Sequence, residues 1–388
     1  MSNATEISSN VTNFRNDSDF NDSCSLVNRT AAEVCQAIAC SLIFITATLG
    51  NTMVVIVVYK ERRMRTTVNF LIVNMALSDF LCSMLVIPRV MTQVYTYPDA
   101  WLITGIAGLI LCKAVHFFQD VTVAVSLLSL LMIAIERYYA ISCPVVADPI
   151  PRKRCGLMIA FTWLVAFLMY ATHFFTFKLS VEEEGPICHH SWEQMVADPV
   201  KAREIEFLLH TVLSVIIPFI VVTAFYTTIL IRIRRSSVPG EASSTVRRRQ
   251  QKRNRNVLHM LLAVVMAFGF CWFPFIVYTY VVTFVWISRN RLQDIPCGVE
   301  IFGQWALYLA YLNSSVNPVI YFVFCENYRK GLTKLIWPCL SPFSNYQHSD
   351  RTRGTVEIDM QFQDTKRRSR RGLPHDQAQY ADVRVRSR

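Results

Sequence analysis

Charged residues are scarce in this sequence, and enzyme motifs are missing. Asp, Glu, Lys and Arg make up 17% of the 388 residues, whereas hydrophobic residues make up 53% and the mean hydropathy is +0.31. One soluble core needs fewer apolar residues than this. The chain contains no Gly-x-Ser-x-Gly, His-Glu-x-x-His, phosphate-binding loop or Cys-x-x-Cys, and no histidine cluster at metal-ligand spacing. We therefore expect a membrane protein that is not an enzyme and holds no cofactor.

The apolar residues are gathered into seven stretches, each long enough for a helix to cross a bilayer, which takes about 20 residues. The stretches span residues 35–59, 69–94, 106–141, 155–177, 205–233, 255–287 and 299–324. They are apolar on all sides, whereas a helix of a soluble protein keeps one polar face. The sequence thus predicts an all-α membrane protein, a seven-transmembrane helix bundle over residues 35–324.

Basic and acidic residues alternate along the chain, whose net charge is +11. Basic residues gather at 60–65, 152–154 and 232–255 and after Arg329, and acidic residues gather in the N-terminal segment and in 181–206. Because cytoplasmic loops are enriched in Lys and Arg, we expect a multi-pass plasma-membrane protein with its N-terminus outside the cell and its C-terminus in the cytosol. The excess of positive charge then faces anionic membrane lipid and is no sign of nucleic-acid binding.

The segments that flank the bundle, 1–34 and 338–388, are expected to be disordered because they offer few apolar residues to bury. We expect no cleavable signal peptide in residues 1–34, because they are polar. They hold five Asn-x-Ser/Thr sequons, which predict glycosylation outside the cell. The five asparagines are Asn3, Asn10, Asn16, Asn21 and Asn28.

Residues 325–337 place apolar residues at helical spacing with basic residues between them, a pattern typical of an amphipathic helix in the membrane interface. We expect Pro338 to end this helix. Cys339, next to it, is either a palmitoylation site or a plain cysteine.

Polar motifs interrupt the apolar stretches. Asp79 lies in the second stretch, Glu136-Arg137-Tyr138 ends the third, Cys271-Trp272-Phe273-Pro274 lies in the sixth, and Asn313–Tyr321 (Asn-Ser-Ser-Val-Asn-Pro-Val-Ile-Tyr) lies in the seventh. Such residues cost free energy in hydrocarbon unless they face a protein-lined interior. The ordered set resembles that of rhodopsin-like (class A) G-protein-coupled receptors over roughly residues 35–340. The resemblance implies a receptor that signals through a heterotrimeric G protein and then meets arrestin and receptor kinases.

Asp79 lies about ten residues into its stretch, and so about 15 Å deep at 1.5 Å per residue. A lone carboxylate there costs at least ~2.5–3.5 kcal/mol, so it needs partners or a cation. The resemblance implies an allosteric sodium site that is coupled to the inactive state. The alternative is an acid that is protonated or satisfied by water. The candidate sodium partners are polar residues at compatible depth: Asn51, Ser126, Asn313, Ser314 and Asn317.

The resemblance also assigns a switch and hinges. Arg137 is expected to be held by Glu136 at rest and to meet the G protein after activation. Tyr138, Tyr226 and Tyr321 match tyrosines of this switch, and Pro144 and Val145 match the loop that docks the G protein. An acidic residue that relatives often place near the start of the sixth helix is missing at Asn254. Phe268 and Trp272 look like the toggle beneath the ligand, and prolines at 218, 274 and 318 permit kinks.

The residues at two positions argue against two classes of ligand, amines and retinal. Gln119 stands where amine receptors have Asp, and Tyr311 stands where opsins have the retinal lysine. Gln119 and Asp120 instead resemble the residues found in receptors for amidated peptides of the RFamide, neuropeptide Y or orexin type. The acidic residues are expected to attract a basic peptide, although an acidic loop can also be merely solvated. The predicted ligand site comprises Gln119, Asp120, Glu182, Glu183, Glu184, Glu206, His210 and Tyr311.

Disulfides are expected on the outer side of the membrane, where they persist. The resemblance implies a bond between Cys112 and Cys188, which ties the loop over 178–202 to the third helix; Gly185-Pro186 in that loop suits a hairpin turn. Cys297 then needs a partner, either Cys24 in the N-terminal segment or Cys35.

Two rival functions remain: a class A receptor for a lipid or other small molecule, or a seven-helix transporter or channel. A transporter would show several ionisable groups along one pore, and beyond Asp79 the deep segments offer few.

Overall fold

The computed structural model of the chain describes residues 29–97, 99–142, 151–183, 185–235, 245–289 and 295–340. Several predictions concern residues outside these ranges, and they stay predictions. They concern the five sequons, Cys24, Pro144, Val145, Glu184 and the segment after residue 340.

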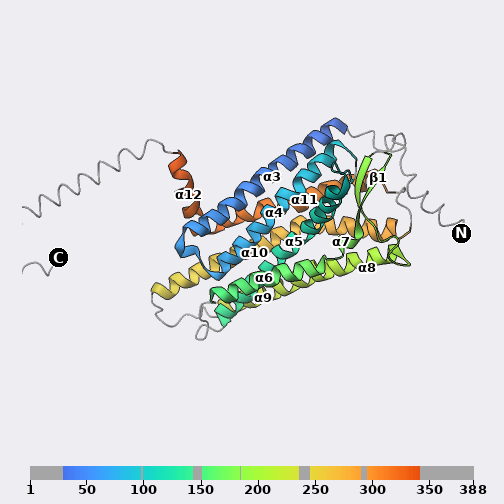
Figure 1. Cartoon of the computed structure of the whole chain (residues 1–388). Helices are drawn as coiled ribbons and strands as arrows, with labels where there is room; N and C mark the ends of the chain where they lie inside the picture. Colours follow the sequence, from blue (N-terminus) through green and yellow to red (C-terminus); the bar gives the residue numbers. More distant parts are fainter. Residues whose placement is uncertain are drawn as a thin grey trace, which may run out of the picture. The chain divides into compact units, whose positions relative to one another are not determined.

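The described residues contain seven helices long and apolar enough to cross a membrane. Side by side they form a bundle (Figure 1). Its helices are α3 (Arg29–Lys60), α4 (Thr67–Tyr95), α5 (Gly105–Ser142), α6 (Arg152–Met169) with α7 (His173–Thr176), α8 (Pro199–Thr211) continuing into α9 (Ile217–Arg235), α10 (Thr245–Val281) and α11 (Cys297–Phe324). A short 3-10 helix, η1 (Arg62–Met64), joins α3 to α4. The predicted fold class is confirmed.

Helix ends deviate from the hydropathy boundaries where capping decides them. The fifth span begins at Pro199, six residues before the predicted start at 205, because Asp198 caps it: its Oδ1 accepts from the Lys201 amide at 3.1 Å. Proline in the first helical turn costs no hydrogen bond, since that amide would lack a helical partner anyway.

Two spans contain a turn of π-helix, η2 (Val212–Ile216) and η3 (Val282–Ile287). Pro218 is the second residue of α9, two positions after η2 ends, and Pro274 and Pro318 lie inside α10 and α11. Each proline lacks an amide hydrogen and so interrupts the backbone ladder where a kink can form.

The long loop before α8 forms a β-hairpin. Strand β1 (Phe177–Glu182) pairs antiparallel with β2 (Gly185–His190), and Leu179 lies opposite Cys188. Gly185 begins β2 at a φ of +131°, and a Cβ on it would lie 2.4 Å from the hydroxyl of Tyr97. The hairpin was expected at this place, but Gly185 and Pro186 start the second strand and do not form the turn.

The helix after α11, α12 (Glu326–Leu340), confirms the predicted short helix, but Pro338 does not end it. Proline removes only one backbone bond, and its φ suits a helix, so two more residues follow it in helical conformation. The first part of α12 packs on the bundle: Tyr328 is fully buried, 5.9 Å from the Tyr321 ring, and a Cβ on Gly331 would lie 2.5 Å from Val57 Cγ1. The bundle and this part of α12 belong to one compact unit that ends at Leu332.

Helix α5 crosses the centre of the bundle and contacts α4, α6, α9 and β1. We name the two ends of the bundle after residues of this helix. The β-hairpin lies at the Cys112 end, and α12 starts at the Arg137 end (Figure 1).

Candidate functional site

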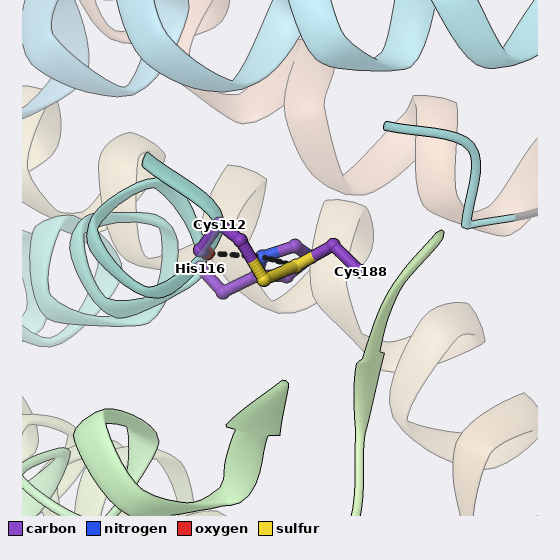
Figure 2. Close-up of side chains that lie close together, drawn as sticks. All are labelled: Cys112, His116 and Cys188. Atoms are coloured by element: carbon purple, nitrogen blue, oxygen red, sulfur yellow. Dashed lines mark hydrogen bonds between the residues drawn. A yellow bond between two sulfur atoms is a disulfide. The ribbon is translucent and has the colours of Figure 1, made fainter. Parts of the chain in front are cut away.

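A disulfide bond joins α5 to the β-hairpin at the Cys112 end. Cys112 and Cys188 are buried and bonded, with Cα atoms 5.8 Å apart. Figure 2 shows His116, one turn along α5, beside this bond; its Nδ1 lies 2.8 Å from the Cys112 carbonyl oxygen and 3.4 Å from Cys188 Sγ. The three side chains are grouped like metal ligands, but the sulfurs are bonded to each other and supply no thiolate. The predicted disulfide is confirmed, and it anchors the hairpin.

Cys297, at the start of α11, is also disulfide-bonded. Cys35 carries a free thiol, so it is not the partner in this structure. Cys24, the other predicted partner, lies outside the described residues.

Beneath the hairpin, polar side chains from three helices meet inside the bundle. Gln119 Oε1 on α5 accepts from Arg89 Nη2 on α4 at 3.0 Å and from the Tyr311 hydroxyl on α11 at 3.4 Å. Tyr311 is buried and Arg89 is half-buried. The structure therefore brings together the predicted residues Gln119 and Tyr311 and adds Arg89, which the sequence interpretation missed. The signal was present, since Arg89 and Asp79 are the only formal charges in α4.

Asp120, the next residue on α5, has a partly exposed carboxylate. Its Oδ2 lies 2.8 Å from His173 Nε2, and its side chain is 36% exposed, whereas that of His173 is 5% exposed. One carboxylate oxygen is therefore left for a ligand. Glu182 and Glu183, at the hairpin tip, are exposed and lie at the same end of the bundle.

Glu206 is engaged by its own protein. Its Oε1 accepts from the Thr172 hydroxyl at 2.7 Å, and its Oε2 accepts from Trp192 Nε1 at 2.8 Å and lies 2.9 Å from His190 Nε2. The carboxylate is 9% exposed. Glu206 therefore clamps the hairpin and its loop to α8. No pattern in the sequence indicates this clamp, because its partners lie before α7, at the end of β2 and in the loop after it, where residues show no periodicity.

His210, one turn further along α8, also points into the bundle. Its Nε2 lies 3.0 Å from the Met169 carbonyl oxygen, and its ring centroid lies 4.5 Å from that of Tyr170. It is half-buried. His210 thus lines the wall between α6 and α8, close to His173 at 5.8 Å between ring centroids.

Asp79 lies in the middle of the bundle and is 4% exposed. Its Oδ1 accepts from the Ser126 hydroxyl at 3.2 Å, and its Oδ2 accepts from Asn317 Nδ2 at 2.8 Å. Ser126 also contacts Ser78 at 2.8 Å between hydroxyl oxygens. Asp79 therefore has neutral partners and no basic one among the described residues.

A small cavity lies next to this carboxylate. Asn313 and Ser314 of α11 line it, as do Asp79, Ser126 and Trp272. The side-chain oxygens of Asn313 and Asn317 are buried without a hydrogen-bond partner. Asn51 lies further away and donates from Nδ2 to the Ser314 carbonyl oxygen at 2.9 Å. The chemistry of this donor set, a carboxylate with amide and hydroxyl oxygens, fits a hard monovalent cation such as sodium.

Phe268 and Trp272 of α10 stack on each other, and Trp272 lines this cavity. Their ring centroids are 5.9 Å apart with an interplanar angle of 18°. The Trp272 Nε1 is buried without a partner, and Pro274 follows two residues later in α10. A buried indole N–H without an acceptor costs roughly 1–3 kcal/mol, so another position of this ring competes with the one observed.

At the Arg137 end, Glu136 and Arg137 form a bidentate ion pair. Arg137 Nη2 donates to Glu136 Oε1 at 2.6 Å, and Arg137 Nε donates to Glu136 Oε2. Both side chains are partly buried, at 21% exposed for Arg137 and 11% for Glu136. The pairing expected of the resting switch is thus present.

Among the described residues, the matching tyrosines form no side-chain hydrogen bond with Arg137. The Tyr226 hydroxyl is buried without a partner, and the Tyr321 hydroxyl lies 3.9 Å from Met75 Sδ. The Tyr138 ring packs on Phe225 at 5.2 Å between centroids and beneath the Arg232 guanidinium at 5.4 Å. Two buried tyrosine hydroxyls therefore lie near this end without a strong acceptor.

The fold and these sites define a seven-helix membrane receptor. The chain matches the family model for the 7 transmembrane receptor (rhodopsin family) over residues 50–321, and it belongs to this family, which is not enzymatic.

Among its relatives is the QRFP-like peptide receptor of Branchiostoma floridae, 31% identical over 76% of this chain and 75% of the relative. Neuropeptide receptor 22 of Caenorhabditis elegans is 28% identical over 78% of this chain and 70% of the relative. Galanin receptor type 2 of Rattus norvegicus is also 28% identical, over 78% and 76%. The chain is therefore a class A receptor whose relatives include neuropeptide receptors.

Proposed function

We propose that this chain is a plasma-membrane receptor for a basic, amidated neuropeptide and that it signals through a heterotrimeric G protein. The observation that carries the proposal is that one helix, α5, joins both sites. Gln119 and the half-open acid Asp120 face the ligand region, and the paired Arg137 lies at the other end of the same helix. The peptide class follows the names of the relatives, two of which are neuropeptide or peptide receptors.

The proposed orientation has the Cys112 end outside the cell. A disulfide persists in that environment. Basic residues at 62–65 and 152–154 begin the connections at the Arg137 end, as expected for the cytosolic side. Glycosylation of the five sequons and palmitoylation of Cys339 are compatible with this orientation and remain predictions.

Asp120 is the proposed acceptor for a basic group of the peptide, with Glu182 and Glu183 attracting it from outside. Glu206 is left out of this role, because its two oxygens already bind three protein groups. Gln119 and Tyr311 would receive the amide end through hydrogen bonds.

Sodium is the proposed allosteric ligand of the Asp79 site, where it would neutralise the buried carboxylate and stabilise the resting arrangement. The buried, unpartnered oxygens of Asn313 and Asn317 support this assignment. Arrestin, receptor kinases and anionic lipid are the further partners that the resemblance implies.

The test uses cells that express the chain, a panel of amidated peptides ending in Arg-aromatic, and calcium and cyclic-AMP readouts. We expect at least one peptide to activate the receptor, and Asp120→Asn or replacement of the peptide Arg by citrulline to reduce its potency about ten- to a hundredfold. Arg137→Ala, matched for surface expression, should abolish the response. Activation by a neutral lipid or an amine, and by no basic peptide at micromolar concentration, would contradict the ligand class and leave the receptor class intact.

A further inference from the structure

Arg89 is a positive charge inside a membrane-spanning helix without an acidic partner. It lies six residues before the end of α4 and directly after Pro88. An arginine within a span costs roughly 2.5–3.5 kcal/mol on insertion scales, and such residues usually pair with another group. No carboxylate oxygen of the described residues lies within ion-pair distance of its guanidinium, since the pairs formed there use other basic residues.

Asp99 interacts with Arg89 electrostatically but does not reach ion-pair distance, and two other acids of the region bind other groups. His173 holds one oxygen of Asp120, and Glu206 binds Thr172, Trp192 and His190. Each of these two carboxylates therefore has partners of its own, and neither forms an ion pair with Arg89.

The groups around Arg89 are donors. Its Nε is buried without a hydrogen-bond partner, and its Nη2 donates to Gln119 Oε1. That oxygen also accepts from Tyr311, so the acceptor of Gln119 is used twice. Its amide nitrogen donates to no residue in the part of the chain that the structure describes. Two helices thus present N–H donors here, Arg89 of α4 and Gln119 of α5, and the Tyr311 hydroxyl of α11 lies beside them.

We propose that Arg89 binds a carboxylate of the ligand, with Gln119 as the second donor. A guanidinium offers parallel N–H groups that match the two oxygens of a carboxylate, and its unpartnered Nε fits one of them. The carboxylate is an Asp or Glu side chain of the amidated peptide; a C-terminal acid bound here would take the place of the amide of the proposed ligand. This inference rests on the proposed peptide ligand and specifies its chemistry: the ligand is acidic at this point, in addition to the basic group assigned to Asp120.

The test uses the purified full-length receptor in detergent and three probes: N-acetyl-Arg-Phe as the free acid, N-acetyl-Arg-Phe-amide, and N-acetyl-Glu-Phe-amide. Binding is read as the probe concentration that gives half the maximal rise in thermal unfolding temperature. We expect at least one carboxylate probe to bind wild type about ten- to a hundredfold more tightly than N-acetyl-Arg-Phe-amide, as for one lost charge-assisted pair. The better carboxylate probe identifies the source, C-terminal or side-chain.

Variants attribute the effect to Arg89. Arg89→Gln should remove the preference for the carboxylate probes. Arg89→Lys keeps the positive charge but loses the parallel N–H donors of the guanidinium, so it should retain part of the preference. Lys113→Gln is the matched control, because it removes a cation at the same end of the bundle, where Lys113 bonds the Phe174 carbonyl oxygen. Equal binding of acid and amide probes by wild type, a preference that survives in Arg89→Gln, or an equal loss in Lys113→Gln would overturn the inference. Carboxylate binding at Arg89 in a receptor that no peptide activates would instead overturn the proposed function alone.

Discussion

Replacement of Asp79 by Asn separates the charge of the buried carboxylate from its shape. Asp79 accepts one hydrogen bond on each oxygen, from Ser126 and from Asn317. An asparagine keeps one of these acceptors and loses the charge, so the oxygens of Asn313 and Asn317 no longer suffice to bind a monovalent cation. We therefore expect Asp79→Asn to remove the influence of sodium on the receptor.

The size of that influence follows from linkage. Coupling between two sites in one protein is typically about 1–3 kcal/mol, which corresponds to roughly 5- to 150-fold in affinity, and it is reciprocal. A sodium ion that favours the resting arrangement should thus lower basal G-protein activation at least several-fold.

Basal nucleotide exchange on the G protein in cell membranes measures this effect without knowledge of the ligand. Exchange is compared at ~150 mM sodium chloride, a physiological ionic strength, and at equal N-methylglucamine chloride, which keeps screening constant. Wild type should show lower exchange in sodium, and Asp79→Asn should show the same exchange in both salts. Asp120→Asn is the matched control, because it removes a carboxylate of the same helix bundle that is open to solvent. Equal sodium dependence in wild type and Asp79→Asn would refute the site.

Three further predictions concern the scaffold. Cys112→Ser or Cys188→Ser should reduce surface display, since the chain-entropy estimate for so long a loop is roughly 3–5 kcal/mol; normal display of both single variants would contradict it. Glu206→Gln should lower the unfolding temperature by an amount equivalent to about 1–3 kcal/mol, because an amide cannot accept from all three donors of the clamp; Glu204→Gln, on the same helix, should not. Gly331→Val should destabilise the purified receptor by about 1–3 kcal/mol through overlap with a side chain of α3, and an unchanged unfolding temperature would exclude that contact.

The seven spans, the short helix after α11 and the disulfide to the hairpin were predictable from the sequence. Spans follow from length and hydropathy, which a bilayer restricts more tightly than water restricts a soluble core. The first residues of the helices were harder to predict, since the start of α8 is set by the cap at Asp198 and not by hydropathy. The predicted helix end at Pro338 was wrong, because the loss of one backbone hydrogen bond does not prevent the helix from continuing past the proline.

The ligand region was predictable only in part. Gln119 and Tyr311 stand out by comparison with related receptors, and the structure brings them into contact. The role of the acids was not accessible, because it depends on which bases reach them: His173 reaches Asp120, and His190 reaches Glu206. Both are loop or helix-end contacts between residues distant in the sequence, and such contacts leave no periodic pattern.

The length of α5 has a mechanical consequence. The helix is continuous over 38 residues. At 3.6 residues per turn, Gln119 and Arg137 are five full turns apart and so share one azimuth, about 27 Å from each other along the axis. Cys112 and Ser126 lie seven residues to either side of Gln119, and thus within about 20° of the same line. A twist of the helix about its own axis would turn the groups of all three proposed sites in the same sense. The disulfide at its Cys112 end ties the helix to the β-hairpin and so resists that rotation.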